Sequence, residues 1–154
     1  MPDTVIISVA TESDIPALSK LLAILFEQEA EFTANPLLQQ RGLRDIISNP
    51  AMGKILVARE NTRTIGMVSL LFSVSTALGG RVAWLEDMIV HPSWRNQGIG
   101  SALVKQALAH CRIEGCRRIT LLTDTDNKAA QDFYRKHGFF SSAMLPMRRL
   151  LDPE

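Results

Sequence analysis

The sequence predicts a three-layer α/β domain, in which helices cover both faces of a central sheet. Short apolar and β-branched runs alternate with segments whose apolar residues recur every three or four positions, in the order β-α-α-β-β-β-α-β-α-β. The chain has 154 residues, of which 46% are hydrophobic and 21% charged, which are ordinary values for a folded domain. We therefore expect one domain spanning residues 1–154.

The first elements are a strand and two helices. Val5–Val9 is apolar and β-branched, as in a strand, and Thr11 or Ser13 can cap the helix that follows it. A second helix begins at Asn35, which precedes a proline, and ends at Asn49, which precedes another. Apolar residues at helical spacing give the first helix a core-facing stripe: Ile15, Leu18, Leu22, Leu25 and Phe26.

The middle of the chain predicts three strands. Ile55–Arg59 and Thr64–Val74 flank the polar turn 60–63 and form a hairpin. Two glycines, beginning at Gly79, let the chain turn back into a central strand, Arg81–His91.

The last part predicts two helices and two strands. The helix Ile99–Glu114 is followed by the strand Arg118–Thr123, and the helix Asp126–His137 ends where a glycine follows it. The apolar and basic segment Met144–Leu151, with Pro146 inside it, is predicted to be the last strand.

Composition excludes several classes of function. A net charge of +1 gives no reason to expect nucleic acid or an anionic membrane as a partner. No apolar run approaches the roughly 20 residues that span a bilayer, and the N-terminus lacks the pattern of a signal peptide. Cys111 and Cys116 match no zinc spacing and are expected to be free thiols in a reducing cytoplasm, and the three histidines lie in separate segments, so no metal site is predicted.

A glycine-rich turn between the central strand and the helix after it is the most informative stretch. Arg95, Gly98 and Gly100 have the spacing R-x-x-G-x-G, and such a turn presents backbone N–H groups at the positive end of a helix dipole. The stretch is neither a P-loop, because no lysine follows, nor a dinucleotide fingerprint, because Leu103 stands where the third glycine belongs. A turn that needs glycine only for its backbone angles is the alternative.

This turn resembles the coenzyme A loop of the N-acetyltransferases of the GNAT family, Arg/Gln-x-x-Gly-x-Gly/Ala. Residues 127–139 resemble the family's second signature, N-x-x-A-x-x-F-Y-x-x-x-G-F. The resemblance implies a mixed, mostly antiparallel sheet with four helices, acetyl-CoA as cofactor, and acetyl transfer to a primary amine. Family members commonly have two strands after the last helix, and only one fits here. The open end of the sheet would then be completed by a shorter strand or by a partner chain, and dimerisation through the C-terminal segment, in a homodimer, is our hypothesis.

The resemblance also assigns the cofactor site. Asn127 and Tyr134 lie seven residues apart and hence on one helix face, where the family's asparagine contacts pantetheine and its tyrosine acts as general acid at the sulfur. A helix cap is the alternative for Asn127, and a buried aromatic is the alternative for Tyr134. The amide of Ile89 is the candidate oxyanion donor, and Lys105 could reach a phosphate. The expected cofactor-binding set is Met88, Ile89, Val90, Arg95, Asn96, Gln97, Gly98, Ile99, Gly100, Ser101, Asn127 and Tyr134.

Two carboxylates interrupt the central strand. Glu86 and Asp87 are adjacent and should point to opposite faces, and a carboxylate there is costly unless it is partnered or used. Partial burial would raise its pKa, which suits a general base. The local Leu-Glu-Asp-x-x-Val resembles diamine acetyltransferases, which implies Glu86 as base and Asp87 as a substrate-orienting or structural group. In the alternatives both carboxylates are structural, or water is the base.

On this interpretation the acceptor of the acetyl group is a small primary amine, and two kinds of amine are considered. Three glutamates lie at the end of the first helix: Glu27, Glu29 and Glu31. Together with Glu86 and Asp87 they would suit a cationic amine. The alternative is that the three glutamates are only a solvated cluster. Stretches at 49–52 and 147–150 instead resemble aminoalkylphosphonate acetyltransferases, whose anionic substrate would call for Arg41, Arg44 or Arg81. Protein N-termini or lysines come next, and then aminoglycosides. A non-catalytic acyl-CoA sensor and a nucleotide-binding regulator are the other classes.

Overall fold

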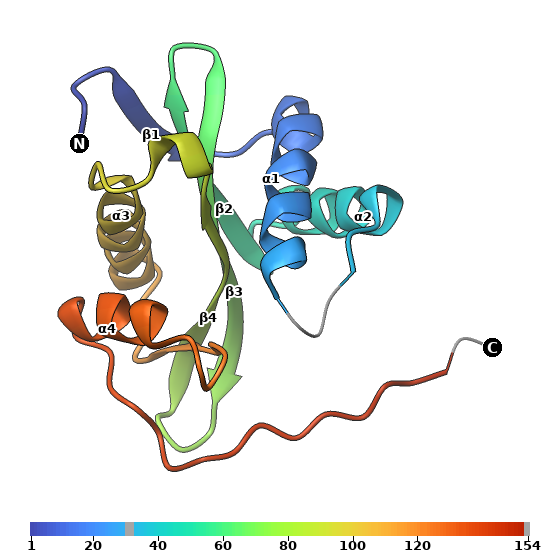
Figure 1. The fold of residues 1–154 in the computed structure, drawn as a ribbon. Helices are drawn as coiled ribbons and strands as arrows, with labels where there is room; N and C mark the ends of the chain where they lie inside the picture. Colours follow the sequence, from blue (N-terminus) through green and yellow to red (C-terminus); the bar gives the residue numbers. More distant parts are fainter. Residues whose placement is uncertain (30–32, 153–154) are drawn as a thin grey trace.

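The computed structural model describes residues 1–29 and 33–152, and its centre is a five-stranded sheet in the order β1-β2-β3-β4-β5 (Figure 1). The neighbouring strands pair antiparallel, except that β4 and β5 pair parallel. The mixed, mostly antiparallel sheet predicted from the sequence is therefore confirmed. The strands are β1 (Val5–Val9), β2 (Gly53–Glu60), β3 (Arg63–Ser75), β4 (Gly80–Val90) and β5 (Ile119–Leu121).

Helices cover both faces of the sheet and bury a separate core on each. One core packs α1 (Ile15–Gln28) and α2 (Pro36–Ile47) against inward residues of β2, β3 and β4. The other core lies under α3 (Ile99–Ile113), and α4 (Lys128–Lys136) packs beside it through half-buried aromatic residues. The residues predicted to face inward on α1 are mostly buried, which places the first helix as its periodicity indicates.

Capping residues and ion pairs fix these elements. The Asn35 side chain accepts a hydrogen bond from the first turn of α2, as expected for a residue before a helix proline. Asp14, which ends a short 3-10 turn (Glu12–Asp14), forms an ion pair with Arg59 of β2. Glu114 at the end of α3 binds both Lys54 at 2.9 Å and Arg81 at 2.8 Å, which connects this end of α3 to β2 and β4.

The segment predicted to form the last strand does not form one. Residues 139–152 contain neither helix nor strand, and Met144–Leu151 is exposed throughout. Figure 1 shows this segment leaving α4 and running past the β3–β4 hairpin to a C-terminus apart from the helices and strands. Its apolar composition fits a strand, but a strand also needs a neighbouring strand to pair with, and in the described residues this segment is paired with none.

No helix in the described ranges is both long and apolar enough to cross a membrane.

Candidate active site

The central strand β4 separates from β5 halfway along its length. β5 pairs only with Ala83, Trp84 and Leu85, while on its other side β4 stays paired with β3 as far as Val90. Within the part of the chain that the structure describes, residues 86–90 therefore have no strand neighbour on the β5 side. Backbone N–H and C=O groups along this stretch are available to an extended ligand that adds like a strand.

A bulge in β4 lies where this separation begins. Asp87 has a positive φ of 52°, and the pairing of β3 with β4 shifts between Met67 and Ser69. Ser69 is the cross-strand partner of Glu86, yet its hydroxyl donates a hydrogen bond of 3.4 Å to the carboxylate of Asp87. The expectation that the two adjacent carboxylates point to opposite faces is therefore wrong, because the bulge interrupts the alternation of side chains.

The environment of Asp87 differs from that of its neighbour. Burial, and next the negative charge of Glu86, raise the pKa of Asp87 from 3.8 to about 6, against the hydrogen bond from Ser69, which lowers it. Glu86 is exposed, and Ser69 is fully buried. Ser69 was not among the predicted site residues, and the only signal for it in the sequence is a serine within the apolar run of β3.

Tyr134 lies on α4 within a small aromatic group. Its ring meets Phe133 and Phe139 edge-on, with ring centroids 5.2 and 5.7 Å away. Burial, and next the negative charge of Glu29 at the end of α1, raise the pKa of the Tyr134 hydroxyl to about 12. The hydroxyl therefore stays protonated throughout the physiological range, as a proton donor must.

The glycine-rich turn leads from β4 into α3 by way of a short 3-10 turn (Pro92–Trp94). Gly98 has a φ of 80°, which glycine adopts without strain, and the first hydrogen bond of α3 runs from the Ala102 amide to the Gly98 carbonyl at 3.0 Å. The amides of Ile99, Gly100 and Ser101 precede that bond and have no partner within the helix. These are amides that the sequence predicts to bind a pyrophosphate, and that role stays a prediction.

Arg95 and Gly100, two residues of the glycine-rich turn, make different contacts with the elements around it. The Arg95 Nε donates to the carbonyl of Val90 at 3.1 Å, which holds the side chain against the end of β4. A Cβ on Gly100 would stand 3.4 Å from the Phe133 ring, an ordinary contact distance, so α4 packs against the start of α3 at this position.

Side-chain contacts hold α4 in place beside this turn. Asn127 accepts a hydrogen bond of 3.1 Å from the Ala130 amide and thus caps α4, which was the alternative to its cofactor role. The cap uses only the side-chain oxygen of Asn127, so the same residue can also serve in the predicted cofactor contact. Ser101 and His137 form a hydrogen bond of 3.2 Å between α3 and α4, and burial, followed by the charge of Lys105, lowers the pKa of His137. His137 was not among the predicted site residues.

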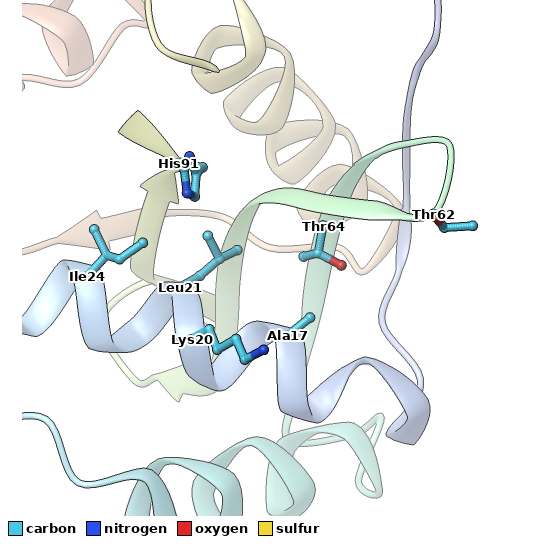
Figure 2. Close-up of a pocket in the computed structure, with 7 residues that line it drawn as sticks. All are labelled: Ala17, Lys20, Leu21, Ile24, Thr62, Thr64 and His91. Carbon is cyan, nitrogen blue, oxygen red and sulfur yellow. The ribbon is translucent and has the colours of Figure 1, made fainter. Parts of the chain in front are cut away.

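The predicted acceptor residues are only partly brought together. Glu29 acts on Tyr134, Glu27 is exposed, and Glu31 lies outside the described residues. A pocket of about 230 Å³ lies elsewhere, between α1, the β2–β3 turn and the end of β4. Figure 2 shows its lining, and none of the predicted catalytic residues belongs to it: Ala17, Lys20, Leu21, Ile24, Thr62, Thr64 and His91.

Comparisons with known proteins agree with this geometry. The model of the acetyltransferase (GNAT) family matches residues 16–139, and the chain therefore belongs to this family of N-acetyltransferases. A glucosamine 6-phosphate N-acetyltransferase of Trypanosoma brucei brucei is 34% identical over 87 residues, which are 56% of this chain and 57% of that protein. A thialysine N-epsilon-acetyltransferase of Bos taurus is 38% identical over 74 residues, or 48% of this chain and 43% of its own length.

The matched stretch thus spans about half the length of these curated relatives. Among solved structures, an integron cassette protein from the mobile metagenome of Cole Harbour Salt Marsh superposes with a TM-score of 0.83 at 25% identity. That superposition covers 96% of this chain and 91% of the other.

Proposed function

We propose that this protein is an acetyl-CoA-dependent N-acetyltransferase that acts on a primary amine of a small molecule. The observation that carries the proposal is the half-open edge of β4, which begins beside Asp87 and ends at the glycine-rich turn. An extended arm ending in a pyrophosphate fits that layout. The arm would pair with the backbone of residues 88–90, and the pyrophosphate would lie at the amides that open α3.

The cofactor would supply an acetyl group already activated as a thioester. The residues of the chain would then do four things. Arg95 and the amides of the turn would hold the pyrophosphate, and Asn127 would hold the arm. The Ile89 amide would donate a hydrogen bond to the acetyl carbonyl oxygen, and Tyr134 would donate its hydroxyl proton to the departing sulfur.

A carboxylate of β4 would take the proton from the attacking amine. The sequence favours Glu86 for this role, but the burial of Asp87 supports Asp87. A pKa of about 6 leaves Asp87 ionised at neutral pH and still basic enough to accept a proton near the working pH. We therefore propose Asp87 as the base, with the exposed Glu86 raising its pKa and attracting the substrate.

The charges around the site favour a cationic acceptor. Each of the two proposed catalytic groups has a further carboxylate near it: the charge of Glu86 acts on Asp87, and the charge of Glu29 acts on Tyr134. An anionic phosphonate would need an arginine instead, and Arg81 is bound to Glu114 at 2.8 Å and stacked 5.1 Å from the Phe72 ring. We propose a diamine-like or amino-acid-like primary amine, and a cytoplasmic location, which two free cysteines support.

The test is release of thiol from acetyl-CoA, with a panel of amines and four proteins. The panel holds diamines and spermidine, basic amino acids, glucosamine 6-phosphate, aminoalkylphosphonates, short peptides and an aminoglycoside. The proteins are wild type, Tyr134→Phe, Asp87→Asn and, as a control that makes the same change at an exposed aspartate, Asp126→Asn. We expect turnover with cationic amines, a loss of about 10²-fold or more in the first two variants, and none in the control.

Other outcomes of this assay would contradict individual parts of the proposal: the acid, the acceptor class or the cofactor site. Turnover that Tyr134→Phe leaves unchanged would remove Tyr134 as acid and keep the function. Turnover with phosphorylated or phosphonate amines alone would overturn the cationic acceptor. Tight binding of acetyl-CoA by calorimetry without turnover of any amine would favour an acyl-CoA sensor, and absence of both would refute the cofactor site.

A further inference from the structure

A side-chain hydrogen bond joins α3 and α4 at the start of α3, and Figure 1 shows the two helices next to each other. His137 follows the last residue of α4, and its Nε2 lies 3.2 Å from the hydroxyl oxygen of Ser101. The His137 ring also meets the Phe133 ring edge-on, with centroids 5.0 Å apart, and Phe133 packs against α3 at Gly100. The imidazole is therefore held from two sides, by a hydrogen bond and by an aromatic contact.

Ser101 lies in the first turn of α3, where the amide N–H groups have no partner within the helix. Its amide is among those that the proposed function assigns to the pyrophosphate. A serine hydroxyl has one proton to donate and two lone pairs that can accept. It can therefore bind His137 and an anion at the same time in only one way: the imidazole donates to the oxygen, and the hydroxyl proton is left for the anion.

The charge state of the His137 ring allows this arrangement. Burial, and next the charge of Lys105, lower the pKa of His137, so the ring is neutral at physiological pH. A neutral imidazole carries one proton, on either nitrogen. With the proton on Nε2 the ring donates to Ser101, whereas with the proton on Nδ1 it would accept the serine proton and withhold it from a ligand. An anion at the start of α3 favours the first form.

We propose that His137 is a positioning residue whose Nε2–H donates to Ser101 and thereby directs the hydroxyl proton of Ser101 toward the pyrophosphate of the cofactor. This inference rests on the proposed function. A hydroxyl that already accepts one hydrogen bond is polarised and donates a stronger second one. The same contact ties the phosphate-binding start of α3 to α4, the helix that carries Tyr134.

The experiment measures the binding of coenzyme A by calorimetry on the full chain, with variants of both partners. His137→Phe keeps a flat ring beside Phe133 but cannot form the hydrogen bond, and His137→Gln restores an N–H donor. Ser101→Ala removes the hydroxyl, and Ser101→Ala/His137→Phe shows whether the two residues act together. The control is His110→Phe, the same change near the other end of α3, at a half-buried histidine whose Nδ1 has no hydrogen-bond partner among the described residues.

We expect the Kd for coenzyme A to rise about tenfold in Ser101→Ala and about three- to tenfold in His137→Phe. The double variant should bind as Ser101→Ala does, His137→Gln should recover most of the loss, and the control should match wild type. In assays with S-acetylpantetheine, which lacks the pyrophosphate, kcat/KM should be the same for wild type and His137→Phe. Nitrogen-15 spectra of the wild-type complex should place the proton of the His137 ring on Nε2.

The outcomes separate this inference from the function on which it rests. Wild type that does not bind coenzyme A would refute both. Wild type that binds it, with the same Kd in His137→Phe, would overturn the role of His137 alone. A further loss from His137→Phe in the Ser101→Ala background, or a loss with S-acetylpantetheine, would do so too, because the ring would then only pack. If circular dichroism shows that His137→Phe is unfolded, the ring spectrum decides: a proton on Nδ1 in the wild-type complex would overturn the proposal.

Discussion

Replacing Asp87 by asparagine should make the protein more stable and less active at the same time. Asparagine has nearly the same shape and keeps an oxygen that can accept the hydrogen bond from Ser69, but it cannot ionise. The change therefore removes the charge and little else.

The size of the expected gain in folding stability follows from the raised pKa of Asp87. In the unfolded chain this carboxyl ionises near 3.8, and in the folded chain near 6, so the folded state disfavours the charge by roughly two pKa units. At about 1.4 kcal/mol per unit, the ionised carboxylate costs the fold about 3 kcal/mol as an upper bound. This cost is still small at about pH 4, grows as pH rises from the unfolded pKa to the folded one, and is complete above about pH 7.

The assay is urea unfolding followed by circular dichroism, at about pH 4 and about pH 7.5. We expect Asp87→Asn to gain stability over wild type mainly at the higher pH, with a much smaller gain at about pH 4, while kcat/KM falls. Asp126→Asn, at an exposed aspartate, should change neither. Equal stability of Asp87→Asn and wild type at both pH values would refute the reasoning, because it would mean that Asp87 is not desolvated.

Three further predictions concern the pH profile, the turn and the fold. Glu86→Gln removes a like charge, so the pH at which kcat/KM rises should move down, and an unchanged profile would rule out the coupling. Gly98→Ala places a side chain at a φ of 80°, which costs about 1–2 kcal/mol and shifts the turn. The Kd for coenzyme A, measured by calorimetry, should therefore rise. The control Gly42→Ala, in the middle of α2 with open space around it, should leave the Kd unchanged. Burial opposes ionisation of Asp14, but its hydrogen bonds, chiefly to Arg59, hold its pKa below 3.8. Asp14→Asn should therefore lose about 1–3 kcal/mol at neutral pH, a loss that disappears as acid protonates the wild-type carboxyl, and a constant loss at all pH values would contradict this account.

The sequence predicts most of the fold because its signals are local. Capping residues and prolines mark the ends of α2, and the glycine spacing marks the turn into α3. The predicted strand Met144–Leu151 is not formed, and the reason is physical. Apolar composition indicates that a segment can be buried, whereas a strand also requires a neighbouring strand, which composition does not encode.

In the candidate site, too, the sequence predicts features that depend on neighbouring residues and misses those that depend on distant ones. Asn127 could be placed as a cap from its position alone, and it is one. The alternation rule fails at Asp87 because a non-glycine residue with positive φ leaves no distinct mark in a sequence. Interactions between distant segments depend on the sheet having formed, and spacing does not encode them. Examples are the hydrogen bond from Ser69 to Asp87 and the effect of the Glu29 charge on Tyr134.

The separation of β4 from β5 has a consequence for how the protein behaves without the proposed cofactor. Residues 86–90 then present an unpaired backbone edge at the middle of the sheet, and such edges promote aggregation. If the cofactor covers that edge, it also protects the protein: at a hundredfold excess over its Kd it would add about 2.7 kcal/mol of stability. We therefore expect the purified protein to precipitate on heating and coenzyme A to keep it in solution, so that the yield of folded protein in a cell follows the supply of its own cofactor.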